Sequence, residues 1–197
     1  MADRFYLNLW FPSFTEDEMM PRTLSVLQSF PYSAAKPGIR CVAVRAVDLS
    51  EPLITQETFP NGADPDVAIA LASEFLHDDN AYEFEACWDL WVPEENDETW
   101  RRQPSTVRFV VHGTGFEDGF YQEAGHIQVD FGLDTPFLYE ELDLTPDAEE
   151  KVRVNVQTLV SFTSAVEKQC GISGRLLWSE SEENLAQKLI ARLQRIQ

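Results

Sequence analysis

The sequence predicts an α+β protein of two layers, in which a mixed, largely antiparallel sheet carries its helices on one side. Two observations predict this class. Residues 82–92 alternate large apolar side chains with mostly acidic ones, which is typical of a strand with one buried face. Residues 152–170 carry apolar side chains at the four-three spacing of a helix. The 197 residues suit one compact domain, 1–197, with a substantial core.

The first part of the chain is predicted to form strand, helix, strand, helix. Residues 4–11 alternate apolar side chains on both faces, as a central strand does. Thr15 and Glu18 have the spacing of a capping box and mark a helix start. Pro21 predicts a kink or a restart in this helix, because proline removes a hydrogen bond. Residues 39–47 are rich in β-branched side chains and predict a buried strand.

The next segments complete the first part and lead into the middle of the chain. Residues 53–59 predict a short edge strand, and the helix that follows begins with Asp64-Pro65-Asp66. Residues 106–112 predict another strand. The glycines between residues 113 and 125 match no phosphate-binding pattern, so they predict a hairpin between antiparallel strands.

The last part of the chain repeats the order of the first. Residues 125–133 predict a half-buried strand. A long helix begins at Thr145-Pro146-Asp147 and ends before Gly171. A short strand at 175–179 and a helix from 181 complete the order. We therefore expect pseudo-repeat halves bridged by the strands at 81–92 and 106–112; the halves are 4–76 and 125–196, each ferredoxin-like in layout.

The net charge of -19 is concentrated in the middle of the chain. Residues 46–150 hold 26 acids against Arg101, Arg102 and Arg108. Such a field repels phosphate and anionic lipid, so we expect no nucleic acid and no membrane as partners. It attracts a basic protein, although acids that only keep the protein in solution would give the same composition. The sequence does not indicate an oligomeric state.

Compartment and cofactors follow from the cysteines and the hydropathy. No run approaches the roughly 20 apolar residues that cross a bilayer, and the apolar start lacks the pattern of a signal peptide. Cys41, Cys87 and Cys170 lie far apart and form no metal-binding pair, which indicates reduced, buried thiols. We expect a cytoplasmic protein without a cofactor.

Two stretches hold candidate partner-binding residues. Trp91 shares a strand face with Glu85 and Asp89, so an exposed indole among carboxylates would hold a cation of a partner, unless a helix covers it. The acidic loop at 134–144 embeds apolar residues, which predict either an anchor in the core or an apolar tip for a partner. The candidates in this loop are Phe137, Tyr139, Glu140 and Glu141.

One alternative is enzymatic. His126 and Asp130 share a strand face, and His112 approaches them if their strands pair, so the three would ligate a metal ion. The leading hypothesis is a non-enzymatic interaction protein that binds a basic protein, as an inhibitor, immunity-type protein or adaptor does. The alternatives are a small metal-assisted hydrolase or ligand-binding enzyme around His112, His126 and Asp130, and a structural subunit of a larger assembly.

Overall fold

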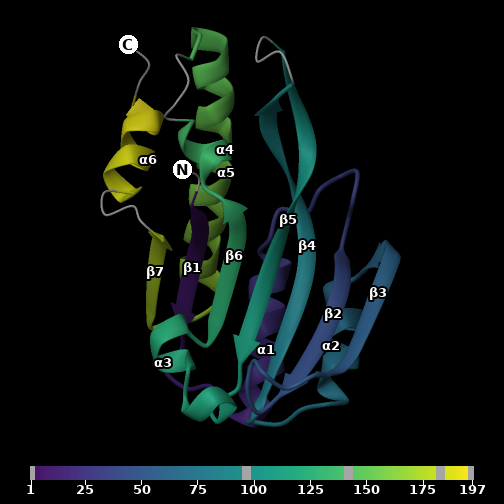
Figure 1. Ribbon diagram of the computed structural model, residues 1–197. Helices are drawn as coiled ribbons and strands as arrows, with labels where there is room; N and C mark the ends of the chain where they lie inside the picture. The colour runs from purple at the N-terminus through teal and green to yellow at the C-terminus, as the bar shows by residue number, and fades with distance from the viewer. Residues whose placement is uncertain (1–2, 95–98, 140–143, 181–184, 195–197) are drawn as a thin grey trace.

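Seven strands form one sheet in the computed structural model, which describes residues 3–94, 99–139, 144–180 and 185–194. The strand order is β3-β2-β4-β5-β6-β1-β7 (Figure 1), and every pair of neighbours is antiparallel. The strands are β1 (Arg4–Trp10), β2 (Ile39–Ala46), β3 (Leu53–Ala63), β4 (Asn80–Pro93), β5 (Trp100–His112), β6 (Ile127–Leu133) and β7 (Gly174–Ser179). The predicted α+β class with an antiparallel sheet is confirmed.

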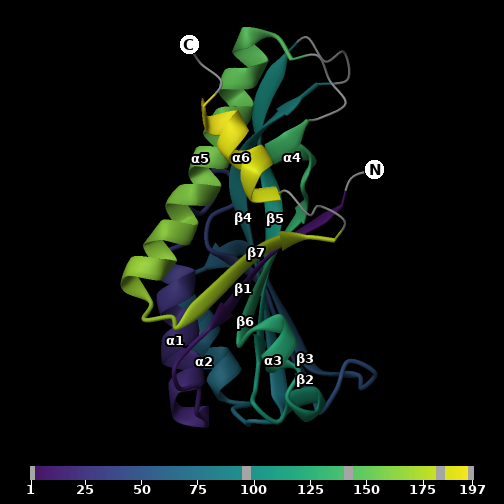
Figure 2. The same ribbon diagram turned by 90° about the vertical axis from the view of Figure 1, so that its left-hand side faces the viewer.

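Three helices lie on one face of the sheet (Figure 2), namely α1 (Glu16–Gln28), α2 (Pro65–Ser73) and α5 (Pro146–Gln169). The short η1 (Phe116–Asp118) and α3 (Tyr121–Ala124) lie at the lower end of the sheet in Figure 1. The remaining helices, α4 (Thr135–Leu138) and α6 (Leu185–Gln194), contact α5 and each other. In the described parts of the chain, no helix is both long and apolar enough to span a membrane.

The core lies between the sheet and α1, α2 and α5, because alternate side chains of each central strand point to that face. On β4 these are fully buried: Tyr82, Phe84, Ala86, Trp88 and Leu90. Trp88 stacks on Phe131 at 5.1 Å between ring centroids, and Phe30 and Phe162 meet edge to face. The strand predicted at 82–92, with one buried face, is therefore β4. It begins two residues earlier and ends one residue later than predicted.

Of the four helix starts that the sequence predicts, those at Thr15, Asp64 and Thr145 are present, and the one at residue 181 lies outside the described residues. The hydroxyl of Thr145 accepts a hydrogen bond from the N–H of Ala148 and caps α5, which continues to Gln169. At α1, the Glu18 carboxylate accepts from the N–H of Thr15 at 3.0 Å. Of the kink or restart predicted at Pro21, the restart is wrong, since α1 is continuous from Glu16 to Gln28, and the kink stays a prediction. Proline there removes only one hydrogen bond of the ladder, and its neighbours keep theirs.

The connections differ from the sequence expectation in two ways. β1 and β2 run in the same direction, but β6, β5 and β4 separate them, and β1 lies between β6 and β7. The strands of the two predicted halves therefore interleave in one sheet, and their duplication stays a prediction. β5 and β6 pair antiparallel as expected, but η1 and α3 fold between them instead of a tight turn.

Candidate functional site

The face of the sheet opposite α1, α2 and α5 carries a row of polar, charged and aromatic side chains, and we call it the open face. Directly paired residues of antiparallel neighbours share a face. The pairings carry one row across all strands: Trp178, Tyr6, Asp130, Arg108, Glu85, Cys41 and Thr58. A second row beside it includes Gln128 of β6 and Glu83 of β4. The central part of this face is uncovered in Figure 1.

At the centre of the open face, Arg108 pairs with two glutamates of β4. Its Nε lies 3.0 Å from Glu85 Oε1 and 3.6 Å from Glu83 Oε1. Burial raises the pKa of Glu83, and the charge of Glu85 raises it too, while Arg108 lowers it. The side chain of Glu83 remains 38% exposed. Two carboxylates thus share one guanidinium, and the charged form of Glu83 is held at a cost.

Asp130 is engaged from two sides. It pairs with the guanidinium of Arg4 on β1, and its other carboxylate oxygen accepts the N–H of Gly132 at 2.9 Å. The pKa of Arg4 is raised by the hydrogen bond with Asp130. Beside this pair, Tyr6 stacks on Trp178 with centroids 4.7 Å apart. The β1–β7 end of the open face is therefore aromatic and charge-balanced, whereas its centre at β4 holds two carboxylates beside one guanidinium.

The structure places Asp89 and Trp91 against their own chain. Asp89 accepts hydrogen bonds from the Ser33 hydroxyl at 2.6 Å and from the Ala34 N–H at 3.2 Å. The Nζ of Lys151, on α5, lies 5.4 Å from the centroid of the Trp91 ring. The sequence left two alternatives for Trp91: a partner's cation on an exposed indole, or a helix that covers the indole. The structure shows the second, because α5 supplies the cation.

Trp91 is held in place by Asn155 of α5. The side chain of Asn155 accepts from the Trp91 N–H and donates to the Trp91 and Pro136 carbonyls, each at 2.8 Å. Asn155 is 1% exposed. A buried amide that satisfies three backbone groups joins the end of β4 to α5 and α4. The sequence signal for it is an asparagine on the apolar stripe of a helix.

In the acidic loop, the apolar residues are anchors. Phe137 is 0% exposed and meets Phe5 at 5.3 Å between centroids, and Tyr139 is 8% exposed and meets Trp100 edge to face at 5.1 Å. Of the two alternatives, an anchor in the core or an apolar tip for a partner, the structure shows the anchor. We therefore leave Phe137 and Tyr139 out of the proposed surface. Glu140 and Glu141 lie outside the described residues.

The predicted metal ligands are not brought together. His112 and His126 do meet across β5 and β6, where the N–H of His112 donates to the His126 carbonyl at 2.9 Å. Asp130 instead pairs across from Arg108, three pairings along the sheet from Val111 and Ile127. In the described residues, the group whose ligand atoms converge is His77, Asp78 and Asp79. This corrects the expectation that strand pairing assembles the site, and the hydrolase alternative stays a prediction from the sequence.

Both imidazoles are used as structural hydrogen-bonding groups. Nδ1 of His126 accepts from the Phe11 N–H at 3.0 Å, and its ring stacks between Phe14 and Tyr121. Burial first, and then the charges of Arg22 and His112, together lower the pKa of His126 to about 4. His112 donates from Nδ1 to the Gly125 carbonyl at 2.9 Å, and burial lowers its pKa.

The sequence analysis missed the group at His77, Asp78 and Asp79. Its side chains lie on the surface, where His77 Nδ1 is 3.2 Å from Asp78 and accepts the Asp79 N–H at 3.1 Å. The three are consecutive in the sequence, so the signal was present. The contacts within the group hold the turn between α2 and β4, and acids on a surface turn commonly occur without an ion.

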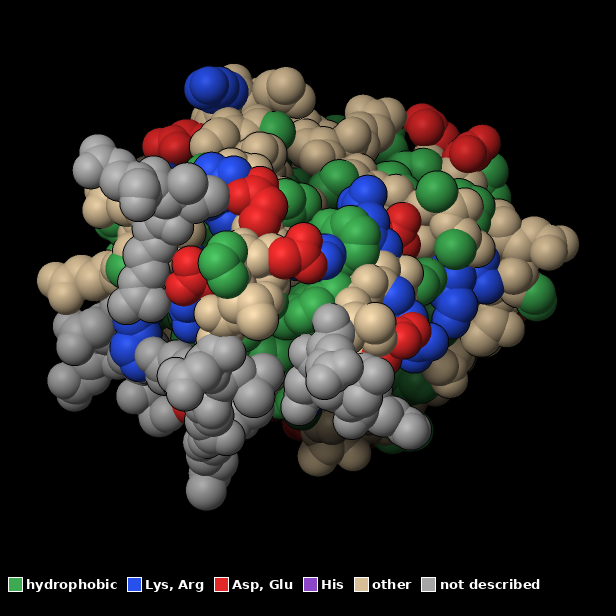
Figure 3. Space-filling view, turned by 90° about the horizontal axis from the view of Figure 1, so that it is seen from above, with side chains coloured by type: hydrophobic (Ala, Val, Ile, Leu, Met, Phe, Trp, Pro, Cys, Tyr) green, Lys and Arg blue, Asp and Glu red, His purple; other side chains and the backbone are tan. Residues whose placement is uncertain are grey.

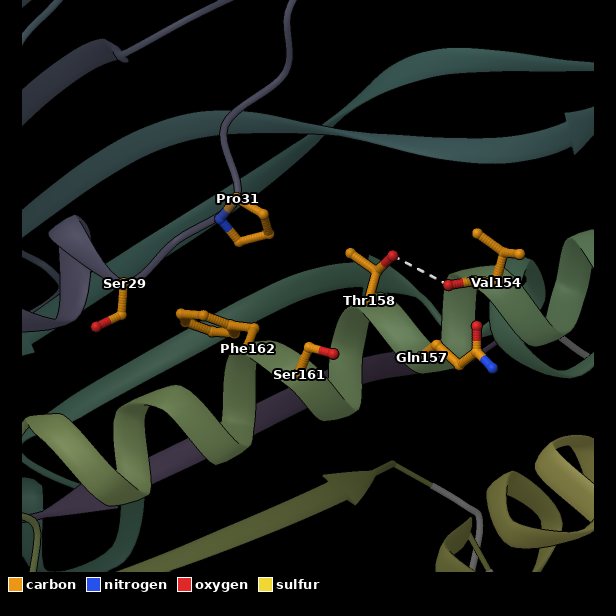
Figure 4. A pocket seen from close by; sticks show the side chains of 7 residues that line it. All are labelled: Ser29, Pro31, Val154, Gln157, Thr158, Ser161 and Phe162. Carbon is orange, nitrogen blue, oxygen red and sulfur yellow. Dashed lines mark hydrogen bonds between the residues drawn. The ribbon is translucent and has the colours of Figure 1, made fainter.

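A groove of about 360 Å³ lies between the C-terminal end of α1 and the middle of α5. Figure 4 shows the hydroxyls of Ser29, Thr158 and Ser161 around it, with Phe162 beside Pro31. The Thr158 hydroxyl donates a hydrogen bond to the Val154 carbonyl at 3.0 Å. None of the described residues that line the groove has an ionisable side chain, so they provide no acid, base or charged metal ligand.

The distribution of charge differs between parts of the surface. At the end of the molecule seen in Figure 3, acidic and basic side chains lie side by side around apolar ones. The acidic imbalance therefore does not dominate this end. The excess of acidic over basic side chains is greater in β3, α2 and the first half of β4, since residues 46–100 contain no lysine or arginine.

Comparison of the chain with protein-family models, with curated proteins and with solved structures finds no match.

Proposed function

We propose that this protein is a non-enzymatic binding protein that takes a basic protein partner on the open face, around Glu83 and Glu85. One observation carries the proposal. The two glutamates share the guanidinium of Arg108 as their ion-pair partner in the described residues, and the charge of Arg45 acts on Glu83 only from a greater distance, so the group holds more negative charge than its one ion pair balances. A lysine or arginine of a partner would balance that excess.

The energetics of Glu83 support the same site. Its raised pKa means that the fold disfavours the charged form relative to water. A cation that binds beside it stabilises that form, so part of the binding free energy comes from relief of an unfavourable state. Natural proteins keep such arrangements mainly where function needs them.

The whole-chain charge supports the class of partner. At a net charge of -19, the chain attracts basic proteins over long range and repels nucleic acid and anionic lipid. We therefore assign an inhibitor, immunity-type or adaptor role, with no cofactor and in the cytoplasm. Cys41, Cys87 and Cys170 are free and buried, which agrees with a reducing compartment.

The test uses a defined cationic probe and two charge-matched variants. A fluorescent peptide that alternates lysine and threonine is titrated at low and moderate salt. The double variant Glu83→Gln, Glu85→Gln removes two charges on the open face. The control Glu74→Gln, Glu167→Gln removes two exposed charges on α2 and α5, in the helix layer.

We expect the open-face variant to weaken binding by about tenfold at low salt, and the control by no more than about twofold. Equal losses in the two variants would mean that the peptide senses only the net charge, and the proposed site would be rejected. Absence of binding to the wild-type protein would reject a basic partner.

A further inference from the structure

We propose that the free edge of β3 binds an extended, basic segment of a partner as an added strand. The basic character of that segment rests on the proposed function, whereas the edge itself is a property of the fold. Strand addition uses the backbone of both chains, so it is a recognition mode separate from the side-chain site at Glu83 and Glu85.

The edge is long and has a regular stretch. Within the described residues, β3 is the terminal strand of the sheet, pairs with β2 alone and spans 11 residues. From Thr55 to Thr58 it follows Val44 to Cys41 without interruption, between two shifts of register. In such a strand, alternate residues direct their N–H and C=O groups away from the neighbour. Those groups face outward along the regular stretch.

The side chains of β3 give this edge little protection. Edge strands commonly carry lysine, proline or an inward charge that discourages pairing. β3 has no lysine or arginine, and its proline, Pro60, lies near its end. Leu53 and Ile54 are 40% and 47% exposed. By contrast β7, at the opposite edge, has only 6 residues and carries Arg175, which pairs with Glu167.

The charges beside the edge select the occupant. Carboxylates lie on β3 and on the segments before and after it: Glu51, Glu57, Asp64 and Asp66 are exposed, and Asp48 is half-buried. The basic side chains that the structure describes on β2 are already engaged with the backbone next to β3. Arg40 donates to the Pro60 carbonyl at 2.7 Å, and Arg45 donates to the Glu51 carbonyl.

A second copy of this chain would bring these acids, including Glu57, against their equivalents, and each copy carries a net charge of -19. A segment that alternates basic and β-branched residues instead pairs its cations with Glu57 and packs its apolar side chains near Ile54. We therefore assign the edge to a basic partner strand rather than to self-association.

The experiment compares peptides of equal charge that differ only in backbone hydrogen bonding. The probe is a capped peptide that alternates lysine and valine. Two further peptides carry N-methyl groups on every second backbone amide, one peptide for each set of alternate amides. Binding is measured by fluorescence anisotropy, and protection of the β3 amides by hydrogen exchange.

We expect the unmodified peptide to bind and to slow exchange at alternate residues of Thr55–Thr58. One N-methylated peptide should lose at least about tenfold in affinity, because it lacks the donors that face β3. Glu57→Lys should weaken the unmodified peptide by about threefold or more, whereas Glu167→Lys, on α5, changes it little.

The outcomes separate the two proposals. Equal binding of all three peptides would overturn strand addition and leave the side-chain site of the proposed function standing. Failure of every peptide to bind would overturn the basic partner and, with it, this occupant of the edge. A peptide-free dimer of the wild-type protein that dissociates in Glu57→Lys would overturn the choice of occupant in favour of a second copy.

Discussion

Nδ1 of His126 accepts a hydrogen bond from the backbone N–H of Phe11 at 3.0 Å. A protonated imidazole has no lone pair at this position, so the bond requires the neutral ring. The interaction ties the start of β6 to the segment that leads from β1 into α1. It also explains why this histidine is a structural residue despite a sequence context that favours a metal ligand.

The first prediction concerns pH. The pKa of His126 is about 4 in the folded protein against an ordinary value of 6.5. Between these values the unfolded chain binds more protons at His126 than the folded protein does. The contribution of neutral His126 to the free energy of unfolding is therefore complete above pH 6.5 and is lost as the pH falls toward 4. The free energy of unfolding should fall by at most about 1.4 kcal/mol per pH unit from this group.

His126→Asn is the matched variant, because its amide oxygen can accept the same N–H without titrating. Urea unfolding of both proteins is measured from pH 7 to pH 4. The wild-type curve should fall relative to that of the variant over this range. Parallel curves would show that His126 does not couple protonation to folding.

The second prediction concerns Glu83, whose folded pKa is raised by burial. The stability associated with this shift is present at pH values below the ordinary value of 4.5 and is lost as the pH rises through the folded pKa. At pH 7 the charged side chain therefore destabilises the fold. Glu83→Gln should unfold at a higher urea concentration than the wild type at pH 7, and this advantage should shrink below pH 4.5.

Glu85→Gln is the control for this experiment, since it weakens the 3.0 Å contact with Arg108 while relieving only the smaller, electrostatic cause of the Glu83 shift, so it should bring a smaller gain in stability than Glu83→Gln. A Glu83→Gln variant that is less stable than the wild type at neutral pH would contradict the argument. Measured beside peptide binding, the stability of Glu83→Gln shows whether the Glu83 side chain lowers the stability of the fold while it strengthens binding.

The third prediction tests Phe137 as a core anchor. Phe137 is 0% exposed and contacts the rings of Phe5 and Trp88. Phe137→Ala should lower the free energy of unfolding by about 3 to 5 kcal/mol, because it opens a cavity in an aromatic cluster. Leu133→Ala, at a side chain 52% exposed, should change it by less than about 0.5 kcal/mol. Near-equal stabilities, by chemical denaturation, would contradict the assignment.

Several features of the fold were predictable because they depend on neighbours in the sequence. The cap at Thr145 and the alternation of Tyr82, Phe84 and Trp88 place α5 and β4. The outcome at Pro21 was less predictable, because packing of Met19, Met20 and Val26 in the core supports a continuous α1. Local signals indicate the elements, and packing decides whether one interruption matters.

The candidate site was predicted only in part. The sequence places Glu83, Glu85 and Asp89 on one face of a strand, but not the partners that distinguish them. Asp89 meets Ser33 from another segment, whereas Glu83 and Glu85 share Arg108. The pairing of Trp91 with Lys151 likewise joins residues that are distant in sequence. Side-chain partners across segments depend on which strands become neighbours.

By itself, the sequence determined the class of fold, most of the strands and helices, and the acidic imbalance of residues 46–150, since periodicity, capping and composition are local properties. Only the tertiary structure decided the strand order, the insertion of β1 between β6 and β7, the shared use of Arg108, and the extension of the predicted short edge strand to the 11 residues of β3. The physical reason is that strand pairing joins segments more than a hundred residues apart, as in Leu7 with Val129 and Leu177. Such pairings are selected by the burial of the whole core rather than by any single stretch of chain.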